Sequence, residues 1–373
     1  MFKQYKLKDY QIQLILCICS LTILGIFVIG SARPEMQLKQ IFGFGIGICL
    51  MVAVSLIDYT YLLKFPWFYY ALMMGLLLSV ELWGKNVNGA QRWLELWEDG
   101  IQIQPSEFAK LAIIAFFAYF FAKYQDNVSD LKTIIMSFAI VGVPLLFILK
   151  QPDLSTTIVT ALIFISLLFI AGLSYKIIVS VLAVVVPIVV VLLVYVIQLA
   201  KATDVSVPYQ LKRILAWLYP TDPRFSEIAL QQQNSIMAIG SGQLWGKGLY
   251  NSEATSMKNA NYILEPQTDF IFAVIGEELG FLGCFIVVIL LLLTVMQCIY
   301  IGSKAKDLQG KLFCCGMAAW IGFQSFVNIC VNTGLMPNTG LPLPFVSYGL
   351  SSVIAIYIGM GIVLNIGLQP KKY

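Results

Sequence analysis

Long apolar runs separated by short polar stretches dominate the hydrophobic pattern of this 373-residue chain. A helix needs about 20 mostly apolar residues to cross the hydrocarbon core of a bilayer. About ten segments meet this condition, and we expect membrane-spanning helices at residues 11–31, 40–57, 66–83, 105–123, 133–149, 155–172, 175–199, 270–301, 312–334 and 345–367. The eighth segment is longer than a bilayer requires, so we expect it to tilt or to extend beyond the bilayer. The predicted fold class is therefore an all-α, polytopic membrane protein.

The lysine and arginine residues of the short loops indicate how these spans are oriented. With the N-terminus in the cytoplasm, twelve such residues fall on the inner side and five in short outer loops. Cytoplasmic loops of membrane proteins carry the excess of positive charge, so both termini are predicted to be cytoplasmic. The large loop 200–269, between the seventh and eighth spans, is then extracellular. Residues 1–373 are predicted to form a single integral membrane domain.

The composition agrees with this prediction and narrows the chemistry. Hydrophobic residues make up 59% of the chain and charged residues 12%, whereas about a quarter is charged in soluble domains. The modest net charge of +4 gives no indication of nucleic-acid binding. Because the chain has no histidine, acid–base chemistry must fall to carboxylates, Lys, Tyr or Cys. The eight cysteines lie in apolar runs without paired CxxC spacing, which predicts buried apolar residues rather than disulfides or a metal site.

The first polar cluster is "GKNVNGAQRWLELWEDGIQIQPSEFAKLAII" (84–114), an outer loop and the start of the next span. Pro105 suits the first turn of a helix, and Glu107 suits its positive end. Lys110 then lies about 7–8 Å inside the span, where a cation needs a partner or a polar cavity. Two interpretations stay open. One is a Glu107–Lys110 ion pair, and the other is a groove in which Arg92 and Lys110 bind an anion.

A second, very short outer turn has the sequence "KQPDLSTT" (150–157). Pro152 and Asp153 stand where the following helix is predicted to begin. Proline at the first turn and aspartate at the N-cap are common at helix starts, so capping is the favoured interpretation.

The long outer loop contains two patterned segments. "YQLKRILAWLYPTDP" (209–223) predicts an amphipathic helix on the outer membrane interface. The residues that form its apolar face are Leu211, Ile214, Leu215 and Leu218. "QQQNSIMAIGSGQLWGKGLY" (231–250) predicts a short helix followed by a glycine-rich turn that carries Lys247. Such glycines allow backbone amides to approach a phosphate, although glycine turns are also common without any ligand.

The stretch "LEPQTDFIFAVIGEELGF" (264–281) brings carboxylates to the mouth of the eighth span. Glu277 follows Asp269 by eight residues, which places it roughly 12 Å deeper and about 80° around the helix, and Glu278 faces away from Asp269. These carboxylates therefore do not form the close pair that glycoside hydrolases use. Because charge inside a span is costly, Glu277 and Glu278 are predicted to bond another helix. Asp269 is either the N-terminal cap of the span, together with Thr268, or a carboxylate that meets a substrate from outside.

The last cluster, "NTGLMPNTGLPLPFVSYGLSS" (332–352), places prolines and glycines between two spans and predicts a loop of defined shape. Asn332, Ser347 and Tyr348 bring hydrogen-bonding groups to the top of the last span. These groups either satisfy interrupted helix backbone or line a cavity.

Together these clusters resemble the SEDS family, the RodA/FtsW/SpoVE proteins of shape, elongation, division and sporulation. The resemblance covers nearly the whole chain. It rests on six motifs in order: "NGAQRWL" (88–94), "QPSEFAK" (104–110), "QPDLSTT" (151–157), "AIGSGQLWGKG" (238–248), "TDFIFAVIGEELGFLG" (268–283) and "PNTGLPLPFVSYG" (337–349). The short length and tails resemble RodA more than FtsW. Two departures are Leu350, where the family usually has a second glycine, and "LYNSEATSMKN" in place of the usual "G-T-Q".

The resemblance implies a ten-helix peptidoglycan glycosyltransferase that polymerises lipid II at the outer face of the bacterial cytoplasmic membrane, during elongation, division or sporulation. It implies a class B penicillin-binding protein as partner, with other elongation or division proteins. The family's essential aspartate matches Asp269, and its functional cations match Arg92 and Lys110.

In the expected mechanism, Asp269 is the general base that activates a sugar hydroxyl, and Arg92 and Lys110 stabilise the departing diphosphate in a single inverting displacement. The further candidates are Lys247, Ser347 and Tyr348 for substrate binding, and Glu107, Asp153, Glu277 and Glu278 as supporting residues. No metal ligand is predicted, because no carboxylate cage is apparent, and Mg²⁺ or Mn²⁺ at the diphosphate stays open. Two other functions are a transporter of lipid-linked precursor and a non-catalytic scaffold for a penicillin-binding protein. The polar residues within the spans make a thin lining, mostly in the outer half, which argues for surface chemistry over transport.

Overall fold

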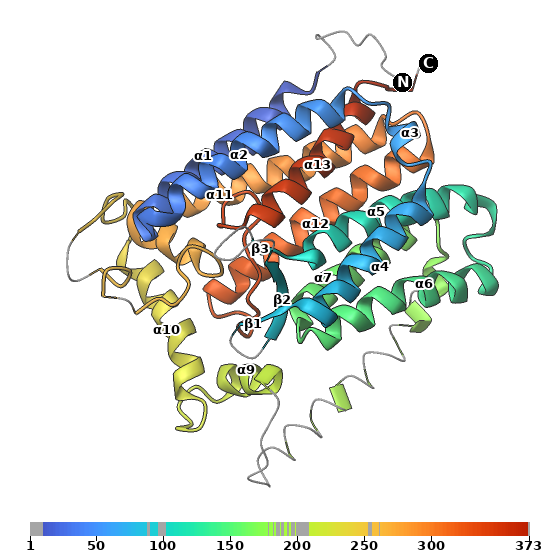
Figure 1. Cartoon of the computed structure of the whole chain (residues 1–373). Coiled ribbons are helices and arrows are strands. Elements are labelled where there is room, and N and C mark those ends of the chain that lie inside the picture. Colours follow the sequence, from blue (N-terminus) through green and yellow to red (C-terminus); the bar gives the residue numbers. More distant parts are fainter. Residues whose placement is uncertain are drawn as a thin grey trace.

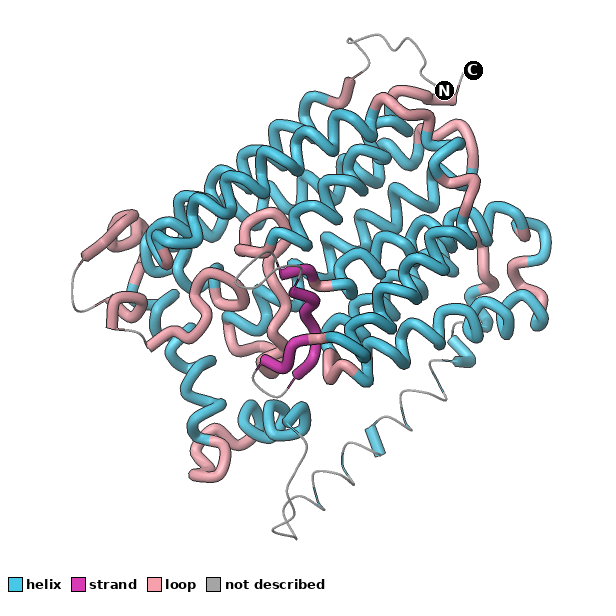
Figure 2. The backbone as a smooth tube through the Cα atoms, viewed as in Figure 1, coloured by secondary structure: helices cyan, strands magenta, loops and turns pink. Residues whose placement is uncertain are grey.

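The computed structural model of the chain describes residues 10–87, 90–95, 102–177, 209–252, 256–260 and 262–371, with isolated residues between 179 and 198. In these residues, long helices lie side by side and short loops join them (Figure 1 and Figure 2). The long helices are α1 (Ile12–Ala32), α2 (Pro34–Ser55), α4 (Pro66–Trp83), α5 (Pro105–Lys123), α6 (Leu131–Lys150), α7 (Leu154–Ile170), α11 (Ile271–Ser303), α12 (Leu308–Asn332) and α13 (Leu350–Gly367). The shorter elements are α3 (Tyr59–Leu62), the 3₁₀ turn η2 (Gln125–Asn127), α9 (Tyr209–Leu218) and α10 (Ser226–Ser241).

These helices confirm the all-α polytopic class. Nine of the ten predicted spans coincide with a long helix, and the span predicted at 175–199 lies largely outside the described residues. Among the described helices, seven are long and apolar enough to cross a membrane, and α7 is apolar but shorter. The last helix begins at Leu350 rather than at residue 345, because the proline- and glycine-rich loop extends to Gly349. The exact number of spans and their orientation stay predictions.

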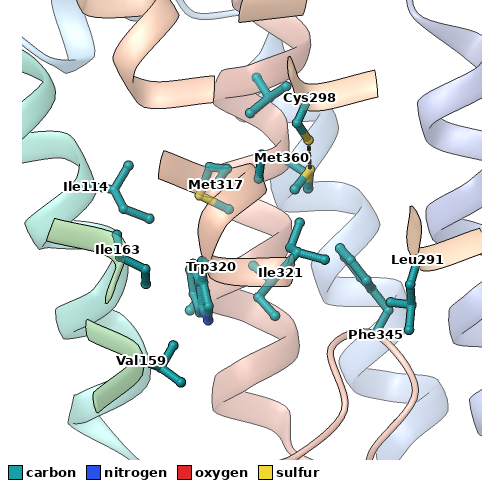
Figure 3. Close-up of a cluster of buried hydrophobic side chains, with 14 of the residues drawn as sticks. Ile114, Val159, Ile163, Leu291, Cys298, Met317, Trp320, Ile321, Phe345 and Met360 are labelled. Atoms are coloured by element: carbon teal, nitrogen blue, oxygen red, sulfur yellow. Dashed lines mark hydrogen bonds between the residues drawn. The ribbon is translucent and has the colours of Figure 1, made fainter. Parts of the chain in front are cut away.

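The core of the bundle lies around α5, α12 and α13. About three quarters of the apolar stretch of each is buried (72%), whereas α2 and α6 bury 28% of theirs and face outward. Figure 3 shows Trp320 and Ile321 of α12 at the centre, with Ile114 of α5 and Ile163 of α7 on one side and Leu291 of α11 on the other. Helix α12 therefore lies at the centre and packs against α5, α7, α11 and α13.

A small antiparallel sheet, which the hydrophobic pattern does not predict, follows α4. Its strands are β1 (Lys85–Val87), β2 (Ala90–Glu95) and β3 (Gln102–Ile103), in the order β1-β2-β3. Antiparallel strands need only short connections, so a loop of this length has room for them. The sheet is tied to the start of α13, because Ser351 Oγ accepts a hydrogen bond from the backbone N–H of Gln104 at 3.0 Å. It holds Arg92, in β2, at this end of the bundle.

The helix α11 is 33 residues long, which corresponds to about 50 Å and exceeds the ~30 Å hydrocarbon core. We predicted that it tilts or extends beyond the bilayer. That stays a prediction, and the structure adds a break in the helix at Gly280, whose φ of 66° and ψ of −164° are not helical. A positive φ of this kind is accessible to glycine because it has no Cβ. The break separates an upper segment with Glu277 and Glu278 from a lower one that contains no charged residue.

The predicted amphipathic helix at 209–223 is present as α9, but its apolar face has a partner within the chain. Leu215 and Ala216 are buried against Phe225 and Ala229, at and beyond the start of α10. Leu218, which the pattern placed on the same face, is 40% exposed. The helix therefore packs on α10 through a narrower face than the sequence predicts.

Candidate active site

The main chain of Asp269 is held by two side chains of α12. Its carbonyl accepts hydrogen bonds from Nδ2 of Asn328 at 2.9 Å and from Nδ2 of Asn332 at 3.0 Å. Asn332 Oδ1 also accepts the backbone N–H of Ala273 at 3.2 Å, in the first turn of α11. The cap position of α11 is Phe270, and no side chain at that position caps it. The prediction that Asp269 might serve as the cap is therefore wrong, since Asn332 satisfies this backbone group.

The carboxylate of Asp269 lies against Gly340 and close to Arg213 of α9. A Cβ added at Gly340 would be 3.2 Å from Oδ2 of Asp269 and 3.5 Å from Nη1 of Arg213. Gly340 has a φ of +75°, which disfavours any side chain there. Three segments far apart in the sequence thus meet at one point, and glycine leaves the space in which they meet.

The surroundings of Asp269 make its carboxyl group a weaker acid than usual. Burial of the carboxylate raises its pKa to about 6, and the negative charges of Glu265 and Asp153 act in the same direction. The positive charges of Arg213 and Arg92 act in the opposite direction. Such a group is mostly ionised at neutral pH yet basic enough to accept a proton, as a general base requires.

Arg92 reaches across from β2 to the turn before α7. Its Nε donates to the carbonyl of Gln151 at 3.1 Å, and its Nη2 donates to the carbonyl of Pro152. The next residue, Asp153, is the N-cap of α7 and accepts the backbone N–H of Thr156 at 3.1 Å. The capping role of Asp153 is confirmed. Arg92 is half-buried and near enough to Asp269 to lower the pKa of that carboxyl group.

Lys110 is enclosed in the bundle. Its Nζ forms the predicted ion pair with Oε1 of Glu107 at 2.6 Å, and it donates to Oε1 of Gln324 at 2.7 Å. It also lies 4.8 Å from the centre of the Trp320 ring. The side chain has 0% exposure, and none of these partners is shared with Arg92. The structure therefore does not place Arg92 and Lys110 in one groove.

Ser347 and Tyr348 fasten the loop before α13 to the segment that precedes Asp269. Ser347 Oγ donates to the carbonyl of Thr268 at 2.6 Å and accepts the backbone N–H of Leu343 at 2.7 Å. The backbone N–H of Tyr348 donates to the carbonyl of Gln267 at 2.8 Å. Of the two alternatives left open by the sequence, these contacts favour the satisfaction of interrupted backbone.

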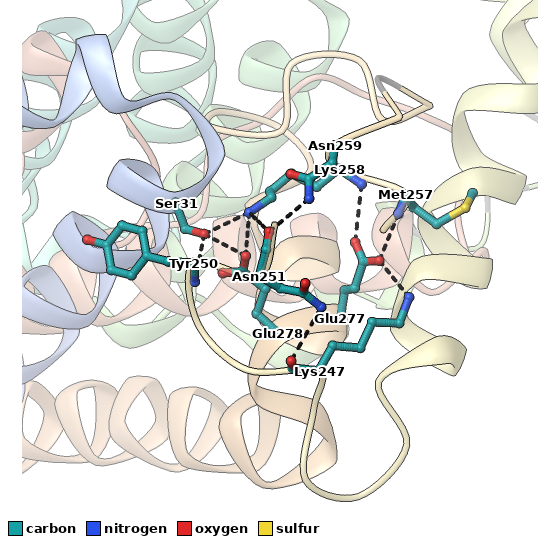
Figure 4. Close-up of polar contacts among 9 residues, drawn as sticks. All are labelled: Ser31, Lys247, Tyr250, Asn251, Met257, Lys258, Asn259, Glu277 and Glu278. Atoms are coloured by element: carbon teal, nitrogen blue, oxygen red, sulfur yellow. Dashed lines mark hydrogen bonds and ion pairs between the residues drawn. The ribbon is translucent and has the colours of Figure 1, made fainter. Parts of the chain in front are cut away.

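Glu277 and Glu278 bond the segments around Lys247 and Lys258, as Figure 4 shows. Glu277 Oε1 pairs with Lys247 Nζ at 2.8 Å, and Glu278 Oε1 pairs with Lys258 Nζ at 2.5 Å. Ser31 of α1 donates to Glu278 Oε1 at 2.5 Å. The prediction that both residues bond another helix is thus corrected, because only Glu278 contacts one and their main partners are loop lysines. Lys247 is engaged in this pairing and is 22% exposed.

The glycine-rich turn at 242–248 supplies hydrogen-bond donors that α11 lacks at its break. The backbone N–H groups of Lys247 and Gly248 donate to the carbonyls of Glu277 and Glu278, at 2.9 Å each. These carbonyls lose their helical partners at the Gly280 break. These two amides are therefore used within the chain and do not support the binding of a phosphate at this turn.

Sequence reasoning missed three residues of this region. Arg213 lies off the apolar face predicted for 209–223 and was given no role, and Gln324 and Asn328 were not singled out. A signal was present for the last two. Gln324, Asn328 and Asn332 are spaced by four residues in an apolar segment, so they share one helix face. Polar residues on one face of a span mark an internal contact or a functional site.

The helices and the carboxylate at one end of them define a polytopic membrane protein with a candidate acid–base site between its loops. Comparison with known proteins gives the family. Residues 10–372 match the family model of the FtsW/RodA/SpoVE proteins, described as "Cell cycle protein". The chain therefore belongs to this family.

Named relatives cover the chain almost completely. It is 34% identical to the "Probable peptidoglycan glycosyltransferase FtsW" of Trichlorobacter lovleyi, over 99% of this chain and 96% of the relative. It is 38% identical to the protein of the same name from Haemophilus influenzae, over 80% and 72%.

Solved structures show the same fold. A chain of the structure described as "Structural coordination of polymerization and crosslinking by a peptidoglycan synthase complex" has a TM-score of 0.77 at 26% identity, covering 96% of this chain and 97% of that one. The crystal structure of the Rod shape determining protein RodA of Thermus thermophilus has a TM-score of 0.66 at 25% identity, covering 96% of each chain.

Proposed function

We propose that this protein polymerises lipid II into glycan strands at the outer face of the bacterial cytoplasmic membrane, with Asp269 as the general base. By its family and its named relatives the chain is a peptidoglycan glycosyltransferase. The proposal adds the identity of the substrate, the membrane at which the reaction takes place and the residues that carry it out. The observation that carries it is the carboxylate of Asp269, which caps no helix and lies between Gly340 and two arginines.

In the proposed reaction, the carboxylate of Asp269 accepts the proton of an acceptor sugar hydroxyl. The hydroxyl oxygen forms a bond to the anomeric carbon of the lipid-linked donor. The bond between that carbon and the diphosphate oxygen breaks, and the diphosphate leaves with the electron pair. One displacement of this kind inverts the anomeric centre. Because a diphosphate is already a weak base, the leaving group needs cationic stabilisation rather than a general acid.

Arg92 and Arg213 are the cations proposed to stabilise that diphosphate. Both are half-buried and act electrostatically on Asp269, so they lie around the place where the reaction occurs. Guanidinium groups suit this role because they present several donors in a plane that matches phosphate oxygens. Lys110 is enclosed, so we assign it an indirect part, through Gln324. Lys247 is proposed to act through its ion pair with Glu277, which holds the outer loop.

The partner proposed for this protein is a class B penicillin-binding protein. The similarity to a chain of a peptidoglycan synthase complex, over nearly its full length, supports an assembly of this kind. The multi-pass helical fold is consistent with a site in the cytoplasmic membrane.

The test is lipid II polymerisation by purified Asp269→Asn protein in vesicles, alone and with its partner. We expect the rate to fall by about 100-fold or more, because a positioned general base contributes roughly 10²–10⁴. Asp222→Asn is the matched control, since Asp222 is a carboxylate of the outer loop that pairs with Arg224. Full-rate polymerisation by a correctly inserted Asp269→Asn protein would exclude the general base.

The same experiment separates the two other functions. Polymer formed from lipid II supplied on one side of the vesicle requires an enzyme and not a transporter. A scaffold would keep its cellular role with Asp269→Asn, whereas an enzyme would lose it.

A further inference from the structure

Three carboxamide side chains form a ladder along one face of α12. Gln324, Asn328 and Asn332 follow one another at intervals of four residues, so each lies about one turn above the last. All three are fully buried, with exposed fractions of 1% or less. Buried amides are costly unless they are hydrogen-bonded, and each of these bonds the main chain of another segment.

The middle amide joins the two segments that meet at the candidate site. Nδ2 of Asn328 donates to the carbonyl of Asp269 at 2.9 Å and to the carbonyl of Leu341 at 2.6 Å. Leu341 follows Gly340, the residue that lies against the Asp269 carboxylate. The Asn328 side chain thus sets the distance between the Asp269 segment and the loop that contains Gly340 and Leu341.

The two outer amides extend this arrangement. Asn332 adds a second hydrogen bond to the carbonyl of Asp269, at 3.0 Å, and caps α11 through Ala273. Gln324 Nε2 donates to the carbonyl of Pro342 at 2.9 Å. Each segment is therefore held twice, by neighbouring side chains of one rigid helix.

Lys110 fixes the orientation of the lowest amide. Oε1 of Gln324 accepts hydrogen bonds from Lys110 Nζ at 2.7 Å and from Trp320 Nε1 at 2.8 Å. Two donors on the oxygen leave the NH₂ group to face the carbonyl of Pro342. Lys110 is therefore connected through Gln324 to the loop at Pro342, without any contact with substrate.

We propose that Gln324, Asn328 and Asn332 are positioning residues of the glycosyl transfer, and that Lys110 acts on the reaction through Gln324. The ladder holds the Asp269 segment and the 340–342 loop in register, which sets where the carboxylate lies relative to Gly340. The inference rests on the proposed role of Asp269 as base. Side chains on a helix position such groups better than loops do, because the helix itself does not yield.

The test is Asn328→Ala, with Asn365→Ala as the matched control. Asn365 is also fully buried and also bonds main chain, through Tyr59 N at 2.8 Å and Ser55 O at 2.7 Å. It lies at the opposite end of the bundle, beside α3 (Figure 1). Both variants lose one buried carboxamide, so both are expected to melt at a similarly lowered temperature. Only Asn328→Ala is expected to lower kcat, by about 100-fold with KM changed far less, because misplacement by about 1 Å has that effect.

The pH–rate profile is a second measurement, and a loss of stability alone would not change it. The charged groups that act on Asp269 come from α9, β2 and the adjoining turns: Arg213, Arg92, Glu265 and Asp153. None of them is on α12, so Asn328→Ala changes no charge beside the carboxylate. We expect the acid limb to move to lower pH, because a loosened segment admits water and reduces the burial that raises the pKa.

The outcomes separate this inference from the proposed function. Asn328→Ala with the kcat and pH profile of Asn365→Ala would overturn the ladder's role, whatever Asp269→Asn does. If Asp269→Asn lost activity in the same series, the proposed role of Asp269 as the general base would still stand. Gln324→Leu provides an independent check, since it removes the link between Lys110 and the 340–342 loop, and unchanged kcat in a folded protein would contradict the role of Lys110.

Discussion

A single methyl group at residue 340 tests whether the position of the Asp269 carboxylate controls the rate. In Gly340→Ala the new Cβ would lie 3.2 Å from Oδ2 of Asp269 and 3.5 Å from Nη1 of Arg213. The first contact is tighter than ordinary van der Waals contact, so the carboxylate must move by a few tenths of an ångström. The φ of +75° adds backbone strain, because an L-residue there brings its Cβ close to a carbonyl oxygen.

Two magnitudes follow from this geometry. The left-handed backbone costs about 1–2 kcal/mol of stability for a residue with a Cβ. If misplacement by about 1 Å lowers the rate about 100-fold, a shift of a few tenths lowers it roughly 3- to 5-fold. The loss of stability and the loss of rate can be separated, because only the loss of rate requires contact between residue 340 and Asp269.

Gly248→Ala is the control for strain without contact. Gly248 has a φ of +94°, and a Cβ there meets nothing within 4 Å. The assay is the initial rate of lipid II polymerisation in vesicles, measured beside the melting temperature of the purified protein. Both variants are expected to lose similar stability, and only Gly340→Ala is expected to lose rate. Equal rates in the two variants would refute the reasoning that Gly340 leaves space for the carboxylate.

The remaining predictions concern charge. Polymerisation by the unmodified protein is expected to fall as the pH drops through about 6, because the base must be ionised and its pKa is raised to about 6. Glu265→Gln removes a negative charge that raises this pKa and is expected to move the acid limb of the pH–rate profile to lower pH, whereas Arg213→Gln is expected to move it to higher pH. Shifts in the same direction would contradict the assignment of the limb to Asp269. Lys258→Met leaves the Glu278 carboxylate buried without its ion-pair partner and is expected to cost about 3–5 kcal/mol, seen as a lower melting temperature. Adding Glu278→Gln should restore most of the loss, and no recovery would show that the pair is not what stabilises this loop.

The positions of the helices could be predicted from the sequence because the length of an apolar run directly reports its fit to a bilayer. The break in α11 could not, since a single glycine is compatible with a continuous helix and nothing in the residues beside Gly280 marks an interruption. The small sheet was missed for a related reason. Its strands span only two to six residues, too few for an alternating pattern to stand out.

The candidate site was predictable only where a residue's own position carried information. Asp269 stands out through the family motif in which it lies, since an aspartate at a helix start is common by itself, and Glu107 and Lys110 stand out because their spacing allows a pair. Arg213 lies 56 residues before Asp269, and nothing local shows that the two approach each other. The enclosure of Lys110 by Trp320 is likewise a property of helix packing, which the sequence of either helix alone does not contain.

The interruption at Gly280 also bears on how the chain enters the membrane during its synthesis. Residues 281–303 form a segment of about 35 Å that contains no Asp, Glu, Lys or Arg, so it matches the lipid thickness by itself. The nine residues from Ile271 to Leu279 need not be inserted with it. The backbone N–H groups of the turn at 242–248 satisfy the carbonyls of Glu277 and Glu278 at the end of this upper segment. The apolar segment can therefore insert by itself, without the two carboxylates that precede the break.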